Sequence, residues 1–125
     1  MEDSVLAFHM EVRPRGHVVI LHCKGRLVYR HEAAAFSHKV GDLLEGRQPL
    51  VVDFTALESI DSAGLGELVL LHLWAQTSHR SMRVANPNPK VRHLLNITNL
   101  VSILYVYATV EEAVNASARE LARPA

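Results

Sequence analysis

One short segment of the chain combines residue types that could carry a regulatory modification. Asp61 and Ser62 precede an apolar stretch with helical spacing, so both lie where a helix is expected to begin. A phosphate there would meet free backbone N–H groups and the positive end of the helix macrodipole. It would add a charge of about −1.5 to −2 at pH 7, enough to repel a partner that buries a neutral serine. The alternative is that Asp61 or Ser62 serves only as the N-cap of the helix.

Two glycines follow the serine inside the first turns of the same expected helix. Glycine costs a helix about 0.5–1 kcal/mol relative to alanine, so Gly64 and Gly66 need a reason to be there. We infer that something approaches the helix backbone closely at this point. The neighbour is either the sheet beneath the helix or another protein above it.

An apolar pair is expected on the outer face of this helix. A helical wheel places Leu70 and Trp74, four residues apart, opposite the side that should rest on the sheet. Exposed apolar pairs often mark interaction sites, and tryptophan is a frequent hot spot. The alternative is that neighbouring elements of the same domain cover both faces. The residues expected on the sheet side are Leu65, Leu68, Val69, His72 and Gln76, with Leu71 and Glu67 placed near the outer pair.

The remaining reactive residue types lack the spacing of a catalytic or metal site. No two of the eight histidines lie three or four residues apart, and no H-E-x-x-H occurs, so we expect no metal site. We predict a buried, hydrogen-bonded imidazole at His72 and an inert buried thiol at Cys23. Ser62 is not in a G-x-S-x-G elbow, and a phosphate-binding loop is absent from the sequence. We therefore expect no enzyme activity and no bound cofactor.

Alternating strand and helix patterns must position these residues. Strands are predicted over residues 5–12, 18–23, 50–54, 82–85 and 101–106, and helices over 32–44, 62–77, 90–96 and 110–121. A turn is expected over 14–16, Gly25 is expected to end the second strand, and Gly46 to close the first helix. Thr109 and Glu112 have the spacing of a capping box. Asp53, at the expected end of the third strand, could orient the Ser62 loop by hydrogen bonding or cap a turn.

This order predicts one α/β domain over residues 1–125. The sheet should be mixed and mostly parallel, with four to five strands flanked by about four helices and an antiparallel first hairpin. The 13 basic and 13 acidic residues cancel, so no charge excess favours nucleic acid. The acidic N-terminus and the lack of a long apolar run predict no secretion signal and no membrane insertion. A single cysteine fits a cytoplasmic location.

The segments around Ser62 resemble a known family. Residues 51–54 (V-V-D-F) and 60–66 (I-D-S-A-G-L-G) are similar to the signature of anti-sigma-factor antagonists, the bacterial branch of the STAS domain. Residues 25–27, 84–86, 91–98 and 110–113 resemble further segments of that family, so nearly the whole chain is covered. The D-S-A-G-L-G string is specific in this setting, between a buried strand and an apolar helix.

The resemblance implies a phosphorylation switch. In this family the serine after the aspartate accepts the phosphate, which assigns that role to Ser62. Its kinase is the anti-sigma factor, an ATP-binding protein, and a serine phosphatase reverses the reaction, so nucleotide and metal belong to the partners. The unphosphorylated antagonist binds the anti-sigma factor and frees the sigma factor. The residues expected to bind the partner are Asp61, Ala63, Gly64, Leu65 and Gly66, with Arg26 and Leu27 in the loop after the second strand and Leu70 and Trp74 on the helix.

The partner's identity stays open at this point. Some family members carry acidic residues in the loop after the second strand, whereas this chain has Arg26 and Arg30. STAS domains also serve as accessory subunits of membrane transport complexes and as components of stress-signalling scaffolds. The first alternative predicts stable association with an ATPase subunit, and the second predicts a large assembly.

Overall fold

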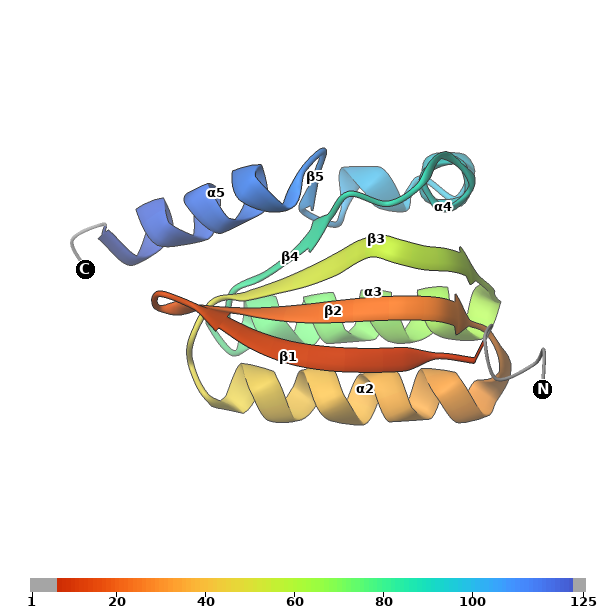
Figure 1. Cartoon of the computed structure of the whole chain (residues 1–125), viewed down its shortest axis with the longest axis horizontal. Helices are drawn as coiled ribbons and strands as arrows, with labels where there is room; N and C mark the ends of the chain where they lie inside the picture. The colour runs from red at the N-terminus through yellow and green to blue at the C-terminus, as the bar shows by residue number, and fades with distance from the viewer. Residues whose placement is uncertain (1–6, 123–125) are drawn as a thin grey trace.

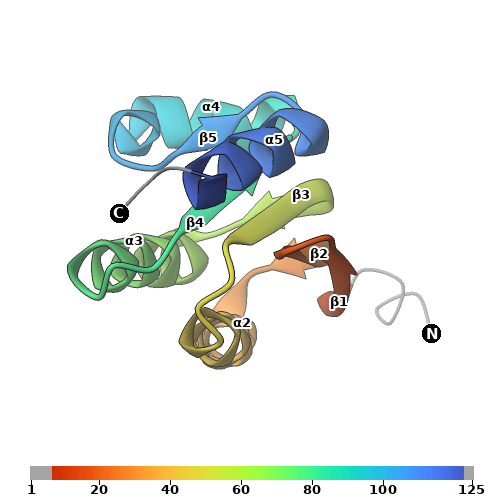
Figure 2. The same cartoon turned by 90° about the vertical axis from the view of Figure 1, so that its left-hand side faces the viewer.

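The computed structural model describes residues 7–122 as five strands flanked by helices on both faces of the sheet (Figures 1 and 2). The strands are β1 (His9–Arg15), β2 (Val18–Leu27), β3 (Leu50–Ile60), β4 (Met82–Ala85) and β5 (Val106–Tyr107). The helices are α2 (Tyr29–Glu45), α3 (Ser62–Thr77), α4 (Pro89–Ile97) and α5 (Val110–Ala122), with a short 3₁₀ helix η1 (Leu100–Ser102). None of the helices in this part of the chain is long and apolar enough to cross a bilayer.

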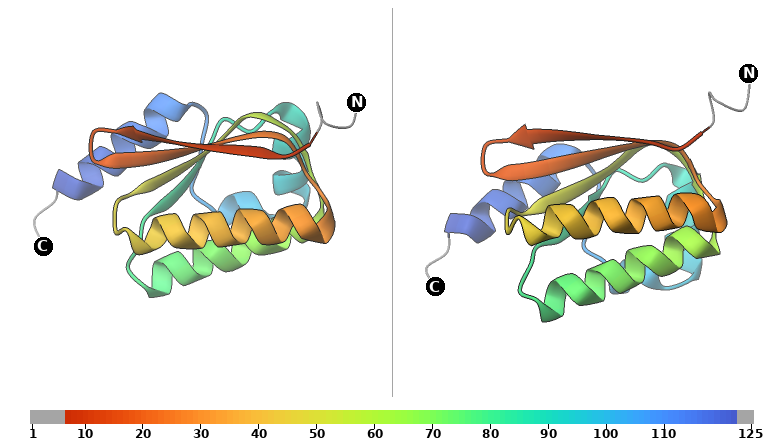
Figure 3. Two further views of the ribbon diagram at one scale, coloured as in Figure 1. Left: turned by 60° about the horizontal axis from the view of Figure 1, so that its bottom comes forward. Right: turned by 90° about the horizontal axis from the view of Figure 1, so that it is seen from below.

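The sheet has the mixed topology that the sequence predicts. Its strand order is β1-β2-β3-β4-β5; β1 runs antiparallel to β2, and the other neighbours are parallel. Helices α2 and α3 lie side by side on one face (Figure 3), and α5 covers part of the other. The predicted fold class is thereby confirmed.

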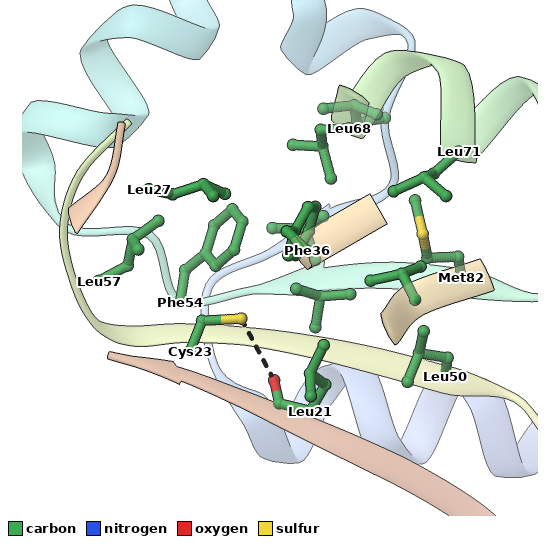
Figure 4. Packing of buried hydrophobic residues seen from close by; sticks show 14 of the residues in the cluster. Leu21, Cys23, Leu27, Phe36, Leu50, Phe54, Leu57, Leu68, Leu71 and Met82 are labelled. Carbon is green, nitrogen blue, oxygen red and sulfur yellow. Dashed lines mark hydrogen bonds between the residues drawn. The ribbon is translucent and has the colours of Figure 1, made fainter. Parts of the chain in front are cut away.

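The main core lies between the sheet and the α2–α3 layer. Phe36 of α2 contacts Phe54 of β3, with ring centroids 6.4 Å apart, and both side chains are fully buried. Figure 4 shows both rings in the cluster of buried residues that also contains Leu27 and Leu57. A smaller cluster on the opposite face packs Val18, Ile20, Val51 and Ala85 against Ala113 and Val114 of α5. Because both faces are covered over residues 50–54, these residues are all buried, as expected of a short apolar strand.

Three helix boundaries follow directly from local sequence signals. The structure has α3 over Ser62–Thr77, as predicted, with Asp61 as its N-cap. The hydroxyl of Thr109 accepts a hydrogen bond from the N–H of Glu112 at 3.1 Å, which confirms the predicted cap of α5. Gly46 is the C-cap of α2, also as predicted.

The first hairpin differs from the prediction at its turn. Strand β1 runs through Pro14 to Arg15, so the turn falls at Gly16 and His17 rather than over residues 14–16. Pro14 is tolerated because β1 is an edge strand, where a missing N–H breaks no ladder on the outer side. Residues 5 and 6 of the predicted strand lie outside the described part of the chain.

The prediction that Gly25 ends the second strand is wrong. Gly25 adopts a φ of +96°, and the pairing register between β2 and β3 shifts on either side of it. Glycine accepts this backbone conformation at little cost, so the strand passes through a bulge and continues. Arg26 and Leu27 therefore belong to β2, paired with Ser59 and Ile60, and not to a loop.

The prediction of a strand over residues 101–106 is also largely wrong. Leu100–Ser102 forms the 3₁₀ helix η1, and only Val106 and Tyr107 pair with β4. Leu104 is buried in the core, and Leu100 and Val101 pack against it. A short apolar run suits a strand and a helical turn equally well by pattern, and here packing against the core selects the turn.

Candidate functional site

Asp61 joins three segments at the start of α3. Its Oδ1 accepts a hydrogen bond from the N–H of Gly64 at 3.1 Å, and its Oδ2 accepts one from the N–H of Tyr29 at 2.8 Å. Its own N–H donates to the carbonyl of Leu27 at 3.2 Å. One residue thus fixes the end of β2 and the first turns of α2 and α3 relative to one another.

The same hydrogen bonds keep Asp61 ionised. The N–H of Tyr29 lowers the pKa of the Asp61 carboxyl most, and the N–H groups of Gly64 and Ala63 lower this pKa further. The start of α3 therefore carries a fixed negative charge beside Ser62. The N–H of Gly64 is already bonded, so a phosphate on Ser62 would share the helix N-terminus with this carboxylate.

Ser62 is exposed at the first position of α3. Four residues along the helix is about one turn, so Gly66, Leu70 and Trp74 follow Ser62 along one side of α3. All four residues are exposed, with Leu70 at 61% and Trp74 at 41%. We call Ser62, Gly66, Leu70 and Trp74 the exposed stripe of α3.

The two glycines of α3 have different surroundings. A Cβ placed on Gly64 would lie 2.7 Å from Cγ1 of Ile60 and 2.9 Å from the carbonyl oxygen of Leu27. A Cβ placed on Gly66 would meet nothing within 4 Å. The close approach expected from the sequence is thus made by the protein's own sheet at Gly64, whereas Gly66 stays open.

The buried side of α3 is rotated from the one that the helical wheel predicts. Leu65, Leu68 and His72 are buried as predicted, but Val69 is only half-buried and Gln76 is exposed. Leu71, which the wheel places next to Trp74, is buried instead. The reason is that α3 packs against α2 as well as against the sheet, which moves the buried stripe toward α2.

Several predicted partner-binding residues lie inside the domain. Leu27 is fully buried in β2, so its side chain is closed to a partner, contrary to the expectation of a loop position. Gly64 and Leu65 are also buried, and Ala63 is half-buried. These residues pack in the interior of the domain at the start of α3. Arg26, by contrast, is exposed.

Arg26 is held by a neighbouring strand. Its Nε donates to Oε1 of Glu58 on β3 at 2.8 Å, and both side chains are about half exposed. This hydrogen bond lowers the pKa of the Glu58 carboxyl. A partner that approaches here meets an ion pair, so the positive charge of Arg26 is partly compensated.

Asp53 lies in the middle of β3 and not at its end. Its Oδ2 is 2.6 Å from Nδ1 of His22, and its Oδ1 accepts hydrogen bonds from the N–H and the hydroxyl of Thr55 at 2.9 and 2.5 Å. Asn86 donates to the same hydroxyl of Thr55 at 3.0 Å. This buried carboxylate therefore connects β2, β3 and the residue that follows β4, and it lies nine residues before Ser62 in the chain.

Tyr29 belongs to this region but had no signal in the sequence. Its side chain is 70% exposed, and its φ of +72° is unusual for a residue other than glycine. The hydrogen bond from its N–H to Asp61 holds it in that conformation. Leu73, 46% exposed next to the stripe, was likewise not expected from the wheel.

The expectations for the two buried reactive residues are met in different degrees. Cys23 is buried as predicted, and burial followed by the nearby charge of Asp53 raises the pKa of its thiol, which disfavours the reactive thiolate. His72 is buried and hydrogen-bonds to the backbone of Ile103, but its Nε2 has no partner among the described residues.

Comparison with known proteins gives a consistent assignment. A curated Thermotoga maritima protein named as a candidate anti-sigma factor antagonist is 34% identical over 71 residues, which cover 57% of this chain and 63% of that relative. The crystal structure of a candidate anti-sigma factor antagonist from Thermotoga maritima superposes with a TM-score of 0.76 at 27% identity, covering 86% of this chain and 93% of that one.

A further solved protein shares the fold, and a family model matches the sequence. The unphosphorylated form of the anti-sigma factor antagonist SpoIIAA superposes with a TM-score of 0.70 at 23% identity, over 94% of this chain and all of that one. The phosphorylated form of Bacillus SpoIIAA gives a TM-score of 0.64 at 21% identity, over 88% and 98% of the chains. A sequence model described as the STAS domain matches residues 9–113. The chain belongs to the STAS domain family.

Proposed function

We propose that this domain is an anti-sigma factor antagonist controlled by phosphorylation of Ser62. The observation that carries the proposal is the exposure of Ser62 at the first position of α3, at one end of the exposed stripe. In the unphosphorylated state the exposed stripe binds an anti-sigma factor. The anti-sigma factor then releases the sigma factor that it held. The relatives named as anti-sigma factor antagonists support this assignment.

The switch works by charge and not by unfolding. An ATP-dependent serine kinase transfers the γ-phosphoryl group to Oγ of Ser62, the hydroxyl proton is lost and ADP leaves. The phosphoserine adds about −1.5 to −2 charge beside the ionised Asp61. A docked partner would have to bury this group without a compensating cation, which costs more than the neutral hydroxyl does.

The helix itself tolerates the phosphate. The positive end of the α3 macrodipole favours negative charge at its first turn, and the Ser62 side chain is exposed to water. The SpoIIAA fold has been solved in both phosphorylated and unphosphorylated forms, which supports a switch within an unchanged fold. A serine phosphatase restores the binding form. Because the kinase uses ATP, we place the protein in the cytoplasm.

The proposal is tested by two substitutions at the same atom. Ser62→Asp should abolish capture of the anti-sigma factor in a pull-down. The new carboxylate is solvated by water in the free protein, and the complex would have to bury it. Ser62→Ala should still bind, yet should accept no phosphate in a kinase assay. Ser102→Asp, at an exposed serine of η1, is the matched control and should bind like the wild type.

Two results would contradict this function. Equal capture by Ser62→Asp and wild type, with both folded by circular dichroism, would remove the charge switch. Stable co-purification with a transport ATPase that phosphate on Ser62 does not release would favour the accessory-subunit alternative. Mass spectrometry of the protein from its own host should find one phosphate on the peptide that contains Ser62.

A further inference from the structure

A polar cleft lies at the opposite end of α3 from Ser62. Two adjoining hollows of about 350 and 340 Å³ are lined by residues from the C-terminal part of α3, β4, β5 and α5 and from the segments that join them. Figure 2 shows how these elements are arranged. The first hollow is lined by Arg83, Tyr105, Tyr107, Ala116, Arg119 and Glu120. The second shares Arg83, Tyr105 and Glu120 with it, so the two form one cleft.

Arg83 is fixed at the base of this cleft. Its Nη1 donates to Oε1 of Glu120 and to the hydroxyl of Ser81 at 2.8 and 2.6 Å, and its Nε donates to the hydroxyl of Tyr107 at 3.2 Å. Burial opposes its charge, but the hydrogen bonds to Tyr107 and Glu120 outweigh burial and raise the pKa of Arg83. Glu120 is therefore already neutralised by a permanent cation.

Two tyrosine hydroxyls in the cleft have protons to donate. The hydroxyl of Tyr107 accepts from Arg83, and the hydroxyl of Tyr105 accepts from Nε2 of Gln76 at 3.2 Å. No residue in the described part of the chain accepts the proton of either hydroxyl. A tyrosine hydroxyl is both donor and acceptor, so each has its donor capacity unused.

The cleft also has an excess of positive charge. Arg119 forms no ion pair with any described residue and is exposed on the wall of the first hollow. Within residues 7–122, the guanidinium of Arg80, on the wall of the second hollow, donates only to the backbone carbonyls of Leu44 and Ser78, at 2.9 and 3.0 Å. Three arginines therefore stand against one glutamate that is already paired.

We propose that this cleft binds a small molecule through a carboxylate or phosphate group. Arg119 supplies a guanidinium that no described carboxylate neutralises, and the hydroxyls of Tyr105 and Tyr107 supply two further donors, which matches an anion with two or more oxygens. Each of the two hollows, at about 350 and 340 Å³, lies at the lower end of the volume range for ligand sites and fits a small metabolite. Gln76 lies 14 residues along α3 from Ser62, about 21 Å, so the cleft is separate from the phosphorylation site.

The proposal is tested by titrating the full chain with inorganic phosphate and, separately, with succinate at constant ionic strength. At least one of the two should bind saturably in calorimetry and raise the thermal midpoint of unfolding, while sodium chloride does neither. Arg119→Gln and Tyr107→Phe should each weaken binding about tenfold, the effect of losing a hydrogen bond to a charged group. Arg92→Gln, at a half-buried arginine of α4 outside the cleft, should bind like the wild type.

The outcomes separate the ligand chemistry from the switch. Binding of phosphate alone assigns a phosphate group, binding of succinate alone assigns a carboxylate, and binding of both assigns a general anion site. The proposal is overturned if neither probe binds saturably at concentrations up to about 20 times a millimolar dissociation constant. It is also overturned if Arg119→Gln binds the probe as tightly as the wild type does. Arg119 is exposed, so this variant is expected to fold. The same titration of Ser62→Ala should be unchanged, which makes the result independent of the proposed phosphorylation.

Discussion

Substitution of the two α3 glycines by alanine should have opposite effects on stability. At Gly64 the new methyl group would lie 2.7 Å from Cγ1 of Ile60, 2.9 Å from the carbonyl oxygen of Leu27 and 3.0 Å from its Cγ. The carbonyl belongs to β2 and also accepts the N–H of Asp61, so it cannot move without breaking that hydrogen bond. At Gly66 the methyl group would meet open space.

The magnitudes follow from two opposing effects. Alanine in place of glycine favours a helix interior by up to about 1 kcal/mol. Overpacking against a fixed backbone costs about 1–3 kcal/mol, so the net loss of unfolding free energy in Gly64→Ala should reach about 2 kcal/mol. Gly66→Ala should gain about 0.5–1 kcal/mol because it incurs no overlap.

Urea unfolding of the two variants and the wild type measures both effects. A change of 1 kcal/mol corresponds to about 3–6 °C in the thermal midpoint of a domain of this size, which is easily resolved. If Gly64→Ala stabilised the domain as much as Gly66→Ala does, the close contact between α3 and β2 would be refuted. Gly66→Ala has a second use, because it should stabilise the domain and yet weaken capture of the anti-sigma factor if the partner lies close to the exposed stripe.

Three further predictions concern the cap of α3, the buried histidine and the exposed tryptophan. Asp61→Ala should cost about 1 kcal/mol in urea unfolding, because it removes the N-cap of α3, whereas Asp61→Asn should lose less because asparagine also caps. Burial lowers the pKa of His72 in the folded protein, so near the ordinary histidine pKa of about 6.5 the unfolded chain binds more protons than the folded one. The contribution of His72 to the free energy of unfolding should therefore be constant above that pH and fall below it. Comparing wild type with His72→Phe at pH 7.5 and 5.5 checks this, since the variant should lose less stability on acidification, and an equal loss would contradict it. Acrylamide should quench Trp74 fluorescence in the free protein and quench it less in the complex; unchanged quenching would place the partner elsewhere.

Local patterns predicted the segment that carries the proposed switch. The aspartate before an apolar helical run predicts the start of α3, and the structure begins the helix at Ser62 with Asp61 as cap. The short apolar run over residues 50–54 predicts a strand buried on both faces, which is also observed. These features depend on neighbours in sequence, whose effect on backbone conformation is read directly from residue type.

Long-range packing decided what the patterns left open. Only the pairing of β2 with β3 shows that the chain continues through Gly25, which moves Leu27 from an expected partner contact into the core. The contact of α3 with α2 rotates the buried side of the helix and buries Leu71. No sequence signal predicts the hydrogen bond from Tyr29 to Asp61, since the two residues are 32 positions apart.

The sequence alone determined the fold class, the helix that begins at Ser62 and the resemblance to anti-sigma-factor antagonists, because periodicity, caps and the D-S-A-G-L-G string are local. The tertiary structure alone decided which residues around the serine are accessible. Exposure depends on which elements pack together, and this is why Gly64 and Gly66, identical in type and two positions apart, have opposite surroundings. The cleft around Arg83 and Tyr107 likewise exists only because β4, β5 and α5 meet there.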